Sequence, residues 1–414
     1  MMFTALLLLA LLSTTVSTEK ARFDNYKVYR VLPNLPEQVK LLHELENAAS
    51  GLNFWSSPSR VNASVDIMVP PHFLPEFNEF TKNLHLSSEL IVHDVQRLID
   101  NERPHGTTRA DFGWTDYYPL EKVYAWLDAQ VKKYPNIVSS IVGGSTYEGR
   151  QIRGVKVSYK DGNPGIFIES GIHAREWITV ATVTYILNEL LTSQDPAIRN
   201  IAENFDWYIF PSTNPDGYEY THTTNRMWRK TRSPGLLCKG ADPNRNWDYH
   251  WMDTGASSNP CSETYAGSKV FSEVETRSLA EYATSIASKI QVYLSFHSYS
   301  QLLMLPYGLN YELPDNYEVL MRIGQKSVAA LAKRYGTDYK YGTIYNIIYP
   351  ASGGSMDWAK KTLNIPYTFE WELRDKGQNG FILPADQIIP TALETLDSVL
   401  SILEDVQALE KEKN

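Results

Sequence analysis

The sequence predicts an α/β protein: a mixed, mostly parallel sheet covered by helices on both faces, preceded by a small α+β open sandwich. Beyond about residue 110, short apolar runs alternate with amphipathic helical patterns, as in sheets buried on both faces. Before residue 101, strand and helix patterns interleave over a much shorter stretch. A length of 414 residues with 43% hydrophobic residues suits one large and one small domain. This composition excludes a disordered or collagen-like chain.

The charge balance limits the classes of partner. Lys and Arg total 39 against 48 Asp and Glu, which gives a net charge of −9. This balance lacks the basic footprint of nucleic-acid binding, so we expect no nucleic-acid partner. The two cysteines exclude a small disulfide-stapled scaffold.

The first 18 residues predict a secretory signal peptide. The apolar run Ala5–Leu12 is followed by the small polar stretch Ser13–Thr18 and then by charged residues. The run is too short to span a bilayer but matches the apolar region of a signal peptide. We therefore expect a secreted, extracellular protein with no membrane segment after signal removal, whose cysteines meet an oxidising environment.

Residues 22–101 read as one compact unit. Polar and apolar residues alternate over 26–31, which predicts a half-buried strand. Further strands are expected at 65–69 and 90–95, and helices at 37–49 and 73–82. Strands and helices interleaved in so short a stretch predict the α+β open sandwich.

The stretch 100–111 interrupts this pattern. It is polar, contains Pro104 and Gly106, and offers Arg103 and Arg109 to a trypsin-like protease. Exposed segments of this kind are where chains are cut. From this stretch alone, a plain linker and a processing site are equally open interpretations.

The remainder of the chain alternates between helical and strand patterns. Strands are expected at 154–158, 165–168, 207–210, 290–296 and 366–371, and helices at 120–131, 179–191, 272–287, 316–335 and 388–403. In such sheets the chemistry collects in the loops at the carboxyl ends of the strands.

Two histidines stand at such strand ends. His173 follows the apolar strand that begins near residue 165, and His297 follows the strand at 290–296. Glu176 lies three residues after His173, so that the two side chains can converge on one ion. Two imidazoles and one carboxylate leave a fourth position open for water, which is the geometry of catalytic zinc. Motifs of other hydrolase and nucleotide-binding classes are absent from the sequence.

The block Gly171-Ile-His-Ala-Arg-Glu-Trp177 resembles the zinc-binding signature of the secreted digestive metallocarboxypeptidases of the carboxypeptidase A/B type. Asp24-Asn-Tyr-Lys-Val-Tyr-Arg30 is similar to the opening of the family's activation propeptide. Further family blocks follow in family order: Asn225–Thr231, Asp242–Trp247, His297–Gln301 with Pro306–Gly308, Ala351–Ser355 and Glu372–Asp375. The resemblance covers essentially the whole chain after the signal peptide.

This resemblance implies a zymogen of a zinc-dependent carboxypeptidase. We expect a signal peptide at 1–18, an activation propeptide at 19–109 and a catalytic domain at 110–414. A trypsin-like protease would activate the zymogen near Arg103 or Arg109. The partners would otherwise be peptide or protein C-termini, and we expect a monomer.

The resemblance also implies the ligands of the metal. One Zn²⁺ per chain would be held by His173, Glu176 and His297. Asp242 would accept a hydrogen bond from His173 and so orient its ring.

The same resemblance implies the catalytic roles. Glu372 would be the general base, taking a proton from water and passing it to the leaving amine. Arg229 would stabilise the oxyanion, and Arg226 would assist.

An exopeptidase must also recognise a free terminal carboxylate. The resemblance implies that Arg245 binds this group through its guanidinium, with hydrogen bonds from Asn244 and Tyr349. Tyr349 could move as a cap over the substrate, and Tyr299 would line the neighbouring subsite.

Cys238 and Cys261 are 23 residues apart in a chain expected to be secreted. We therefore predict a disulfide between them, which would stabilise the fold by roughly 3 kcal/mol.

The specificity pocket implied by the resemblance has an apolar lining. Basic-specific members of the family place an Asp where this chain has Met356. Burying Lys or Arg without a counter-charge is costly, so we expect a preference for aliphatic or aromatic C-terminal residues. Its lining residues would be Gly308, Ile344, Ile348, Ala351, Gly354 and Met356.

One departure complicates this picture. Between Trp358 and Glu372 the chain is one residue longer than the family pattern, and Glu370 shares a strand face with Glu372. Glu370 could attract a basic residue, hold a proton or be bulged out by the insertion, so a preference for basic C-terminal residues stays open. It is also a rival candidate for the base, although the following Leu373–Asp375 favours Glu372.

Two other function classes are alternatives. One is a catalytically inactive secreted binding protein on the same scaffold, and the other is a zinc amidase acting on non-peptide carboxylates. The metal ligands, the base and the anchor arginine are all present, which favours the peptidase.

Overall fold

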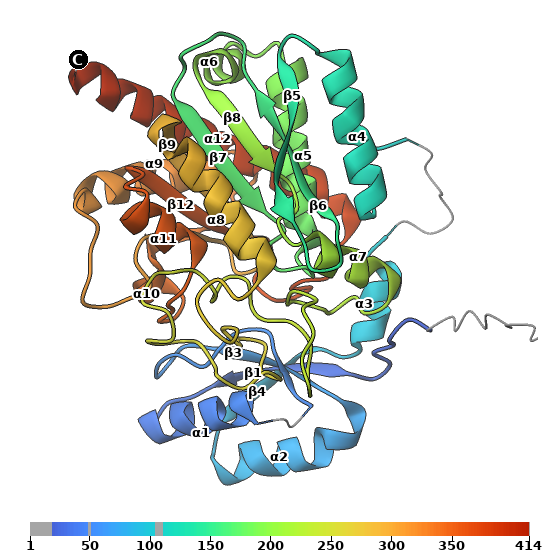
Figure 1. The fold of residues 1–414 in the computed structure, drawn as a ribbon. Helices are drawn as coiled ribbons and strands as arrows, with labels where there is room; N and C mark the ends of the chain where they lie inside the picture. The colour runs from blue at the N-terminus through green and yellow to red at the C-terminus, as the bar shows by residue number, and fades with distance from the viewer. Residues whose placement is uncertain (1–18, 49–50, 104–110, 414) are drawn as a thin grey trace, which may run out of the picture.

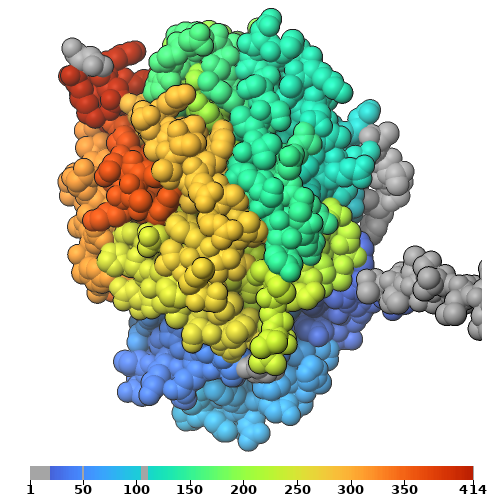
Figure 2. Space-filling model, in the orientation of Figure 1, coloured from blue at the N-terminus to red at the C-terminus, as the bar shows by residue number. Residues whose placement is uncertain are grey.

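The computed structural model describes residues 19–48, 51–103 and 111–413, which form two units (Figure 1). The expected signal peptide and Arg109 lie outside these described residues. A small unit precedes a large unit along the chain, and each contains its own sheet. Figure 2 shows the small unit, in blue, packed against yellow-green segments of the large unit.

The small unit is the expected α+β sandwich. Its antiparallel sheet has the strand order β2-β3-β1-β4. The helices α1 and α2 cover the face of the sheet turned away from the large unit (Figure 1). Val31, Ile67 and Phe77 are buried between that sheet and its helices. The elements are β1 (Lys27–Leu32), α1 (Pro36–Asn47), β2 (Asn53–Phe54), β3 (Val65–Val69), η1 (Pro71–Phe73), α2 (Leu74–Asn83), β4 (Ser87–Val92) and α3 (Val95–Asn101).

The end of this unit corrects the sequence prediction. The strand expected at 90–95 ends at Val92, because Asp94 starts a helix instead. The Asp94 carboxylate accepts a hydrogen bond from the backbone N–H of Gln96 at 3.0 Å, a typical helix N-cap. Helix α3 then runs to Asn101, so the first two residues of the expected linker are helical.

The large unit contains an eight-stranded sheet in the order β11-β10-β12-β9-β7-β8-β6-β5. The four central strands are mutually parallel, as expected, and antiparallel pairings occur towards both sides. The predictions of β6, β7, β8, β9 and β12 are confirmed, whereas β5, β10 and β11 were not predicted. The strands are β5 (Val138–Ser145), β6 (Gln151–Val157), β7 (Gly165–Ser170), β8 (Asp206–Phe210), β9 (Ile290–Ser298), β10 (Leu302–Leu305), β11 (Lys340–Thr343) and β12 (Tyr367–Leu373).

Helices cover both faces of this sheet. In β7, Ile166 and Ile168 point to one core and Phe167 to the other, as strand alternation requires. The first core is shared with α4, α5, α6, α9 and α12, and the second with α8 and α11. The helices are α4 (Leu120–Lys133), α5 (Trp177–Thr192), α6 (Pro196–Asn204), α7 (Pro215–Thr223), α8 (Val274–Ile286), η2 (Ala287–Lys289), α9 (Tyr317–Tyr335), α10 (Ile344–Ile347), α11 (Ser355–Thr362), η3 (Ala385–Gln387) and α12 (Ile388–Lys413). Among the helices described, none is long and apolar enough to span a membrane.

Candidate active site

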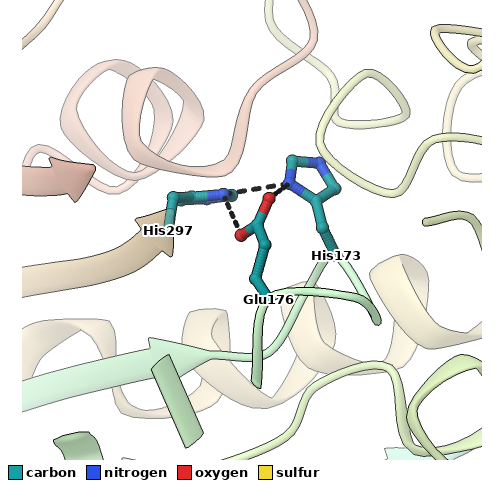
Figure 3. Close-up of side chains that lie close together, drawn as sticks. All are labelled: His173, Glu176 and His297. Atoms are coloured by element: carbon teal, nitrogen blue, oxygen red, sulfur yellow. Dashed lines mark hydrogen bonds and ion pairs between the residues drawn. The ribbon is translucent and has the colours of Figure 1, made fainter. Parts of the chain in front are cut away.

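Three side chains from the carboxyl edge of the sheet converge on one point (Figure 3). His173 follows β7, Glu176 immediately precedes α5, and His297 is near the end of β9. Because β7 and β9 are adjacent and parallel, their carboxyl ends lie side by side. The Nδ1 atom of His173 lies 2.8 Å from Oε1 of Glu176, and Nδ1 of His297 lies 3.2 Å from Oε2. The two Nδ1 atoms are 3.0 Å apart.

This donor set fits a metal ion. Two ring nitrogens this close to each other and to a buried carboxylate need either a shared proton or a metal cation between their lone pairs. Nε2 of His173 lies 3.1 Å from Oδ1 of Asp242, which leaves Nδ1 as the lone-pair donor. Two imidazoles and one carboxylate provide three of the four positions of a catalytic zinc site.

The electrostatics of the cluster also favour a cation. Burial alone would raise the pKa of Glu176, but His173 and His297 hold that pKa well below its usual range. Burial alone would lower the pKa of His297, but the carboxylates of Glu370 and Glu176 raise it to about 10. Both shifts have the same cause: the carboxylates gathered here stabilise positive charge at this point.

Arg229 lies beside this cluster. It is buried, and its Nη2 donates to Oδ2 of Asp242 at 2.8 Å. Its Nη1 is 3.9 Å from Oε1 of Glu176. Asp242 therefore contacts both a metal-ligand ring and the guanidinium expected at the oxyanion.

Two glutamates from β12 face the same cavity. Glu372 is paired with His297 on β9, and Glu370 is paired with Ser295. Both side chains line the cavity that contains His173 and His297. Oε2 of Glu372 has no hydrogen-bond partner within the described part of the chain. Burial, with the nearby charge of Glu176, raises the pKa of Glu372 well above its usual range.

The pairing of β12 excludes one of the roles considered for Glu370, namely that the insertion bulges it out of the strand. The register with β9 is continuous from Tyr367 to Leu373, so Glu370 is not bulged out of the strand. The additional residue expected between Trp358 and Glu372 must therefore lie before β12 begins.

The expected carboxylate anchor lines this cavity. Arg245, Asn244 and Tyr349 all face it. The Arg245 Nη1 donates to the carbonyl oxygen of Asn244 at 2.8 Å, and its Cζ lies 5.6 Å from the Tyr349 ring centroid. Gly353 has a φ of +72°, and a Cβ there would lie 2.4 Å from the Arg245 carbonyl oxygen. Only glycine allows this close approach, which fixes the loop against Arg245.

Most of the residues expected to form the specificity pocket line this cavity. Gly308 is not among the residues that line the cavity, and its N–H donates to Oδ2 of Asp357, which does line it, at 2.8 Å. Met304 and Asp357 do line the cavity and were not predicted. The expected residues that line it are Ile344, Ile348, Ala351, Gly354 and Met356.

Two other expected site residues contact the small unit in this structure. Tyr299 donates its hydroxyl to Asp66 at 2.7 Å. Arg226 was expected to assist at the oxyanion, but its Nε donates to Glu102 at 2.8 Å and its other nitrogens donate to Glu102 and to backbone carbonyls. In this structure Arg226 therefore holds the small unit, and the sequence offered no signal for that contact.

The predicted disulfide is present. Cys238 and Cys261 are bonded, with their Cα atoms 5.0 Å apart. The bond closes part of the long segment between α7 and α8, which also carries Arg229, Asp242 and Arg245.

Comparisons with known proteins agree with this geometry. Residues 123–398 match the family described as "Zinc carboxypeptidase", and residues 29–102 match "Carboxypeptidase activation peptide". Zinc carboxypeptidase A 1 of Anopheles gambiae is 48% identical over 410 residues, which cover 98% of this chain and 95% of that relative. Carboxypeptidase A2 of Mus musculus is 41% identical over 399 residues, or 93% of this chain and 94% of that one.

A solved structure is similar over the same extent. The crystal structure of the carboxypeptidase A from Helicoverpa armigera superposes with a TM-score of 0.85 at 29% identity, covering 94% of this chain and 99% of that chain. Similarity across both units shows that the chain belongs to the zinc carboxypeptidase family, as a carboxypeptidase A-like proenzyme that binds zinc through His173, Glu176 and His297.

Proposed function

We propose that this proenzyme yields an exopeptidase that releases single aliphatic or aromatic residues from peptide and protein C-termini. One observation carries the proposal. The zinc ligands His173 and His297, the side chain of Glu372, whose Oε2 has no partner among the described residues, the side chain of Arg245 and an apolar wall all line one cavity. A C-terminal residue placed there would have its carboxylate, its scissile bond and its side chain each facing a suitable group.

Recognition of the C-terminus is assigned to Arg245, Asn244 and Tyr349. The planar guanidinium of arginine matches a carboxylate in two parallel hydrogen bonds. The Asn244 amide and the Tyr349 hydroxyl add donors from neighbouring positions. Substrates without a free carboxylate lose these bonds, which makes the site an exopeptidase site.

The chemistry is divided among the other residues. When bound, zinc supplies a Lewis acid that polarises the scissile carbonyl and makes water a nucleophile near neutral pH. Glu372 takes a proton from the attacking water and gives it to the leaving amine. Its Oε2, which has no hydrogen-bond partner among the described residues, is free to hold that proton between the two steps. Arg229 places positive charge where negative charge develops on the carbonyl oxygen.

The side-chain preference follows from the pocket wall. Met356 is 1% exposed and lines the cavity with Ile344 and Ile348. Binding is favoured when an aliphatic or aromatic side chain of the substrate is buried against this apolar wall.

Secretion and activation complete the proposal. Residues 1–18 would be the signal peptide, 19–109 the propeptide and 110–414 the active enzyme, a monomer in the extracellular space. The disulfide is consistent with an oxidising compartment. A trypsin-like protease would cut near Arg103 or Arg109. The Arg103 side chain is 46% exposed although its Nε donates to Asp116 at 2.8 Å.

A panel of peptides that differ only in the C-terminal residue tests this function. We expect trypsin-activated enzyme to release Phe and Leu and to leave the same peptides intact when the C-terminus is amidated. Equal processing of amidated peptides would indicate a different amide hydrolase. Failure to process any free-acid peptide would favour the inactive binding protein.

A further inference from the structure

The side chain of Glu370 places a carboxyl group in the otherwise apolar wall formed by Met304, Ile344, Ile348 and Met356. Glu370 is 5% exposed and lines the cavity beside Met304, Ile344, Ile348 and Met356. An isolated carboxylate in an apolar wall is costly unless it meets a donor. The residue therefore needs an explanation beyond packing.

The backbone fixes this group in the pocket. Glu370 lies on β12, paired with Ser295 on β9 and with Met304 on β10. Since its neighbours on both sides are strands, the residue cannot turn to the opposite face without also moving Glu372. Its carboxyl group thus belongs to the same face as the candidate base.

Two other buried carboxylates nearby, Asp242 and Glu169, have side-chain donors. Asp242 accepts from Arg229, and Glu169 accepts from the hydroxyls of Ser295 and Ser355. No hydrogen bond to the Glu370 carboxyl is found across the described residues. Nε2 of His297 lies 3.9 Å from Oε2 of Glu370. Glu370 is thus a buried acceptor that faces the substrate pocket.

We propose that Glu370 is a specificity residue that lets the pocket accept a C-terminal lysine or arginine in addition to apolar residues. This inference rests on the proposed exopeptidase function and extends its substrate class. The aliphatic stem of the substrate side chain packs against Ile344, Ile348 and Met356. Its cationic head donates charge-assisted hydrogen bonds to the Glu370 carboxylate.

A different role for Glu370 would be to orient His297, as Asp242 orients His173. The carboxylate-to-histidine distances show that Glu370 and Asp242 are not equivalent. Asp242 lies 3.1 Å from its histidine nitrogen, whereas Glu370 lies 3.9 Å from Nε2 of His297, beyond hydrogen-bond range. The amide nitrogen of Asn244 is closer to that Nε2, at 3.4 Å. The geometry therefore favours the pocket role.

Matched substrate pairs test the proposal on activated enzyme. Acylated dipeptides ending in lysine or norleucine differ only in the terminal amine, and those ending in arginine or citrulline differ mainly in charge. We expect the parent enzyme to cleave the lysine and arginine peptides. In Glu370→Gln, the lysine-to-norleucine and arginine-to-citrulline ratios of kcat/KM should fall by about 10- to 100-fold. Glu121→Gln, on the exposed face of α4, is the matched control and should leave both ratios unchanged.

The outcomes separate the alternatives. Ratios that stay within twofold in Glu370→Gln would overturn the proposal. An equal fall for all four peptides, together with loss of retained zinc, would instead assign Glu370 to positioning His297. Parent enzyme that cleaves norleucine peptides but not lysine peptides would refute this inference alone. Parent enzyme that cleaves none of the peptides would refute the proposed function itself.

Discussion

His297 and Glu372 lie directly opposite each other on the parallel strands β9 and β12. One contributes a zinc ligand, and the other presents an unpartnered carboxyl oxygen to the same cavity. Because the two strands share a continuous ladder from Tyr367 to Leu373, the sheet itself fixes the spacing between ligand and candidate base. Sites carried by strands are held more precisely than sites on loops, and this spacing does not depend on loop conformation.

This pairing predicts the effect of replacing the base. Glu372→Gln should retain zinc, because the ligands are unchanged, and should lose about 10²- to 10⁴-fold in kcat. Steady-state kinetics together with metal analysis would check this. Near-normal turnover in Glu372→Gln, with loss of turnover on all substrates in Glu370→Gln, would move the role to Glu370.

Asp242 orients a ligand of the metal site. It is fully buried and contacts both Nε2 of His173 and Nη2 of Arg229. Asp242→Asn should weaken zinc binding by about 10- to 100-fold, since the ring of His173 loses the acceptor that fixes its tautomer. Competition with a chelator measures this, and Asp253→Asn, an exposed carboxylate, is the control. Equal zinc affinity in parent and Asp242→Asn would contradict the supporting role.

The small unit is held by a buried ion pair. Nε of Arg226 donates to Glu102 at 2.8 Å, and the two side chains are at most 5% exposed. Removing one member of a buried pair typically costs about 3–5 kcal/mol. In full-length Glu102→Gln, peptidase activity should therefore appear sooner after limited trypsin cleavage, because the cut propeptide dissociates more readily.

The control for this experiment is Glu89→Gln, an exposed position on β4. It should follow the parent time course. A time course in Glu102→Gln that matches both parent and control would show that the pair does not retain the propeptide.

The buried carboxyl group of Glu275 should make the free energy of unfolding depend on pH. Burial raises the pKa of Glu275, on α8, to about 7. Its pKa in an unfolded chain is about 4.3. Because the folded protein binds this proton more tightly, the contribution of Glu275 to stability falls as the pH rises from about 4.3 to 7. Above pH 7 the buried carboxylate is ionised, and it then lowers the free energy of unfolding by its full amount.

Glu275→Gln removes this titration while keeping the acceptor for the Tyr147 N–H. The variant should exceed the parent in unfolding free energy at pH 8, by up to about 3 kcal/mol, and the difference should shrink towards pH 5. Denaturant unfolding at both pH values measures it. Glu281→Gln, exposed on the same helix, should show no such trend. A pH-independent difference for Glu275→Gln would contradict the pKa assignment.

Much of the fold and the metal site could be predicted from the sequence. Apolar runs of strand length gave the central strands, because strands buried on both faces are nearly continuous in hydrophobicity. His173 and His297 were placed together because they follow such strands, and carboxyl ends of parallel strands meet at one edge. The disulfide followed from two cysteines in a chain expected to be secreted.

The rest depends on tertiary contacts. Strands β10 and β11 have four residues each, too short for periodicity to identify. The helix begun by Asp94 was missed because the apolar residues at 90–95 cover both the end of β4 and the start of α3. Glu102 and Arg226 are 124 residues apart, and no local pattern links them.

The most direct test measures zinc and activity on the same activated sample. We expect one zinc per chain, complete loss of C-terminal residue release after chelation, and recovery when Zn²⁺ is restored. His297→Ala should contain no zinc and should release no residue at any zinc concentration that restores the parent. Undiminished release of C-terminal residues by metal-free protein would contradict the assignment of His173, Glu176 and His297 to a catalytic zinc.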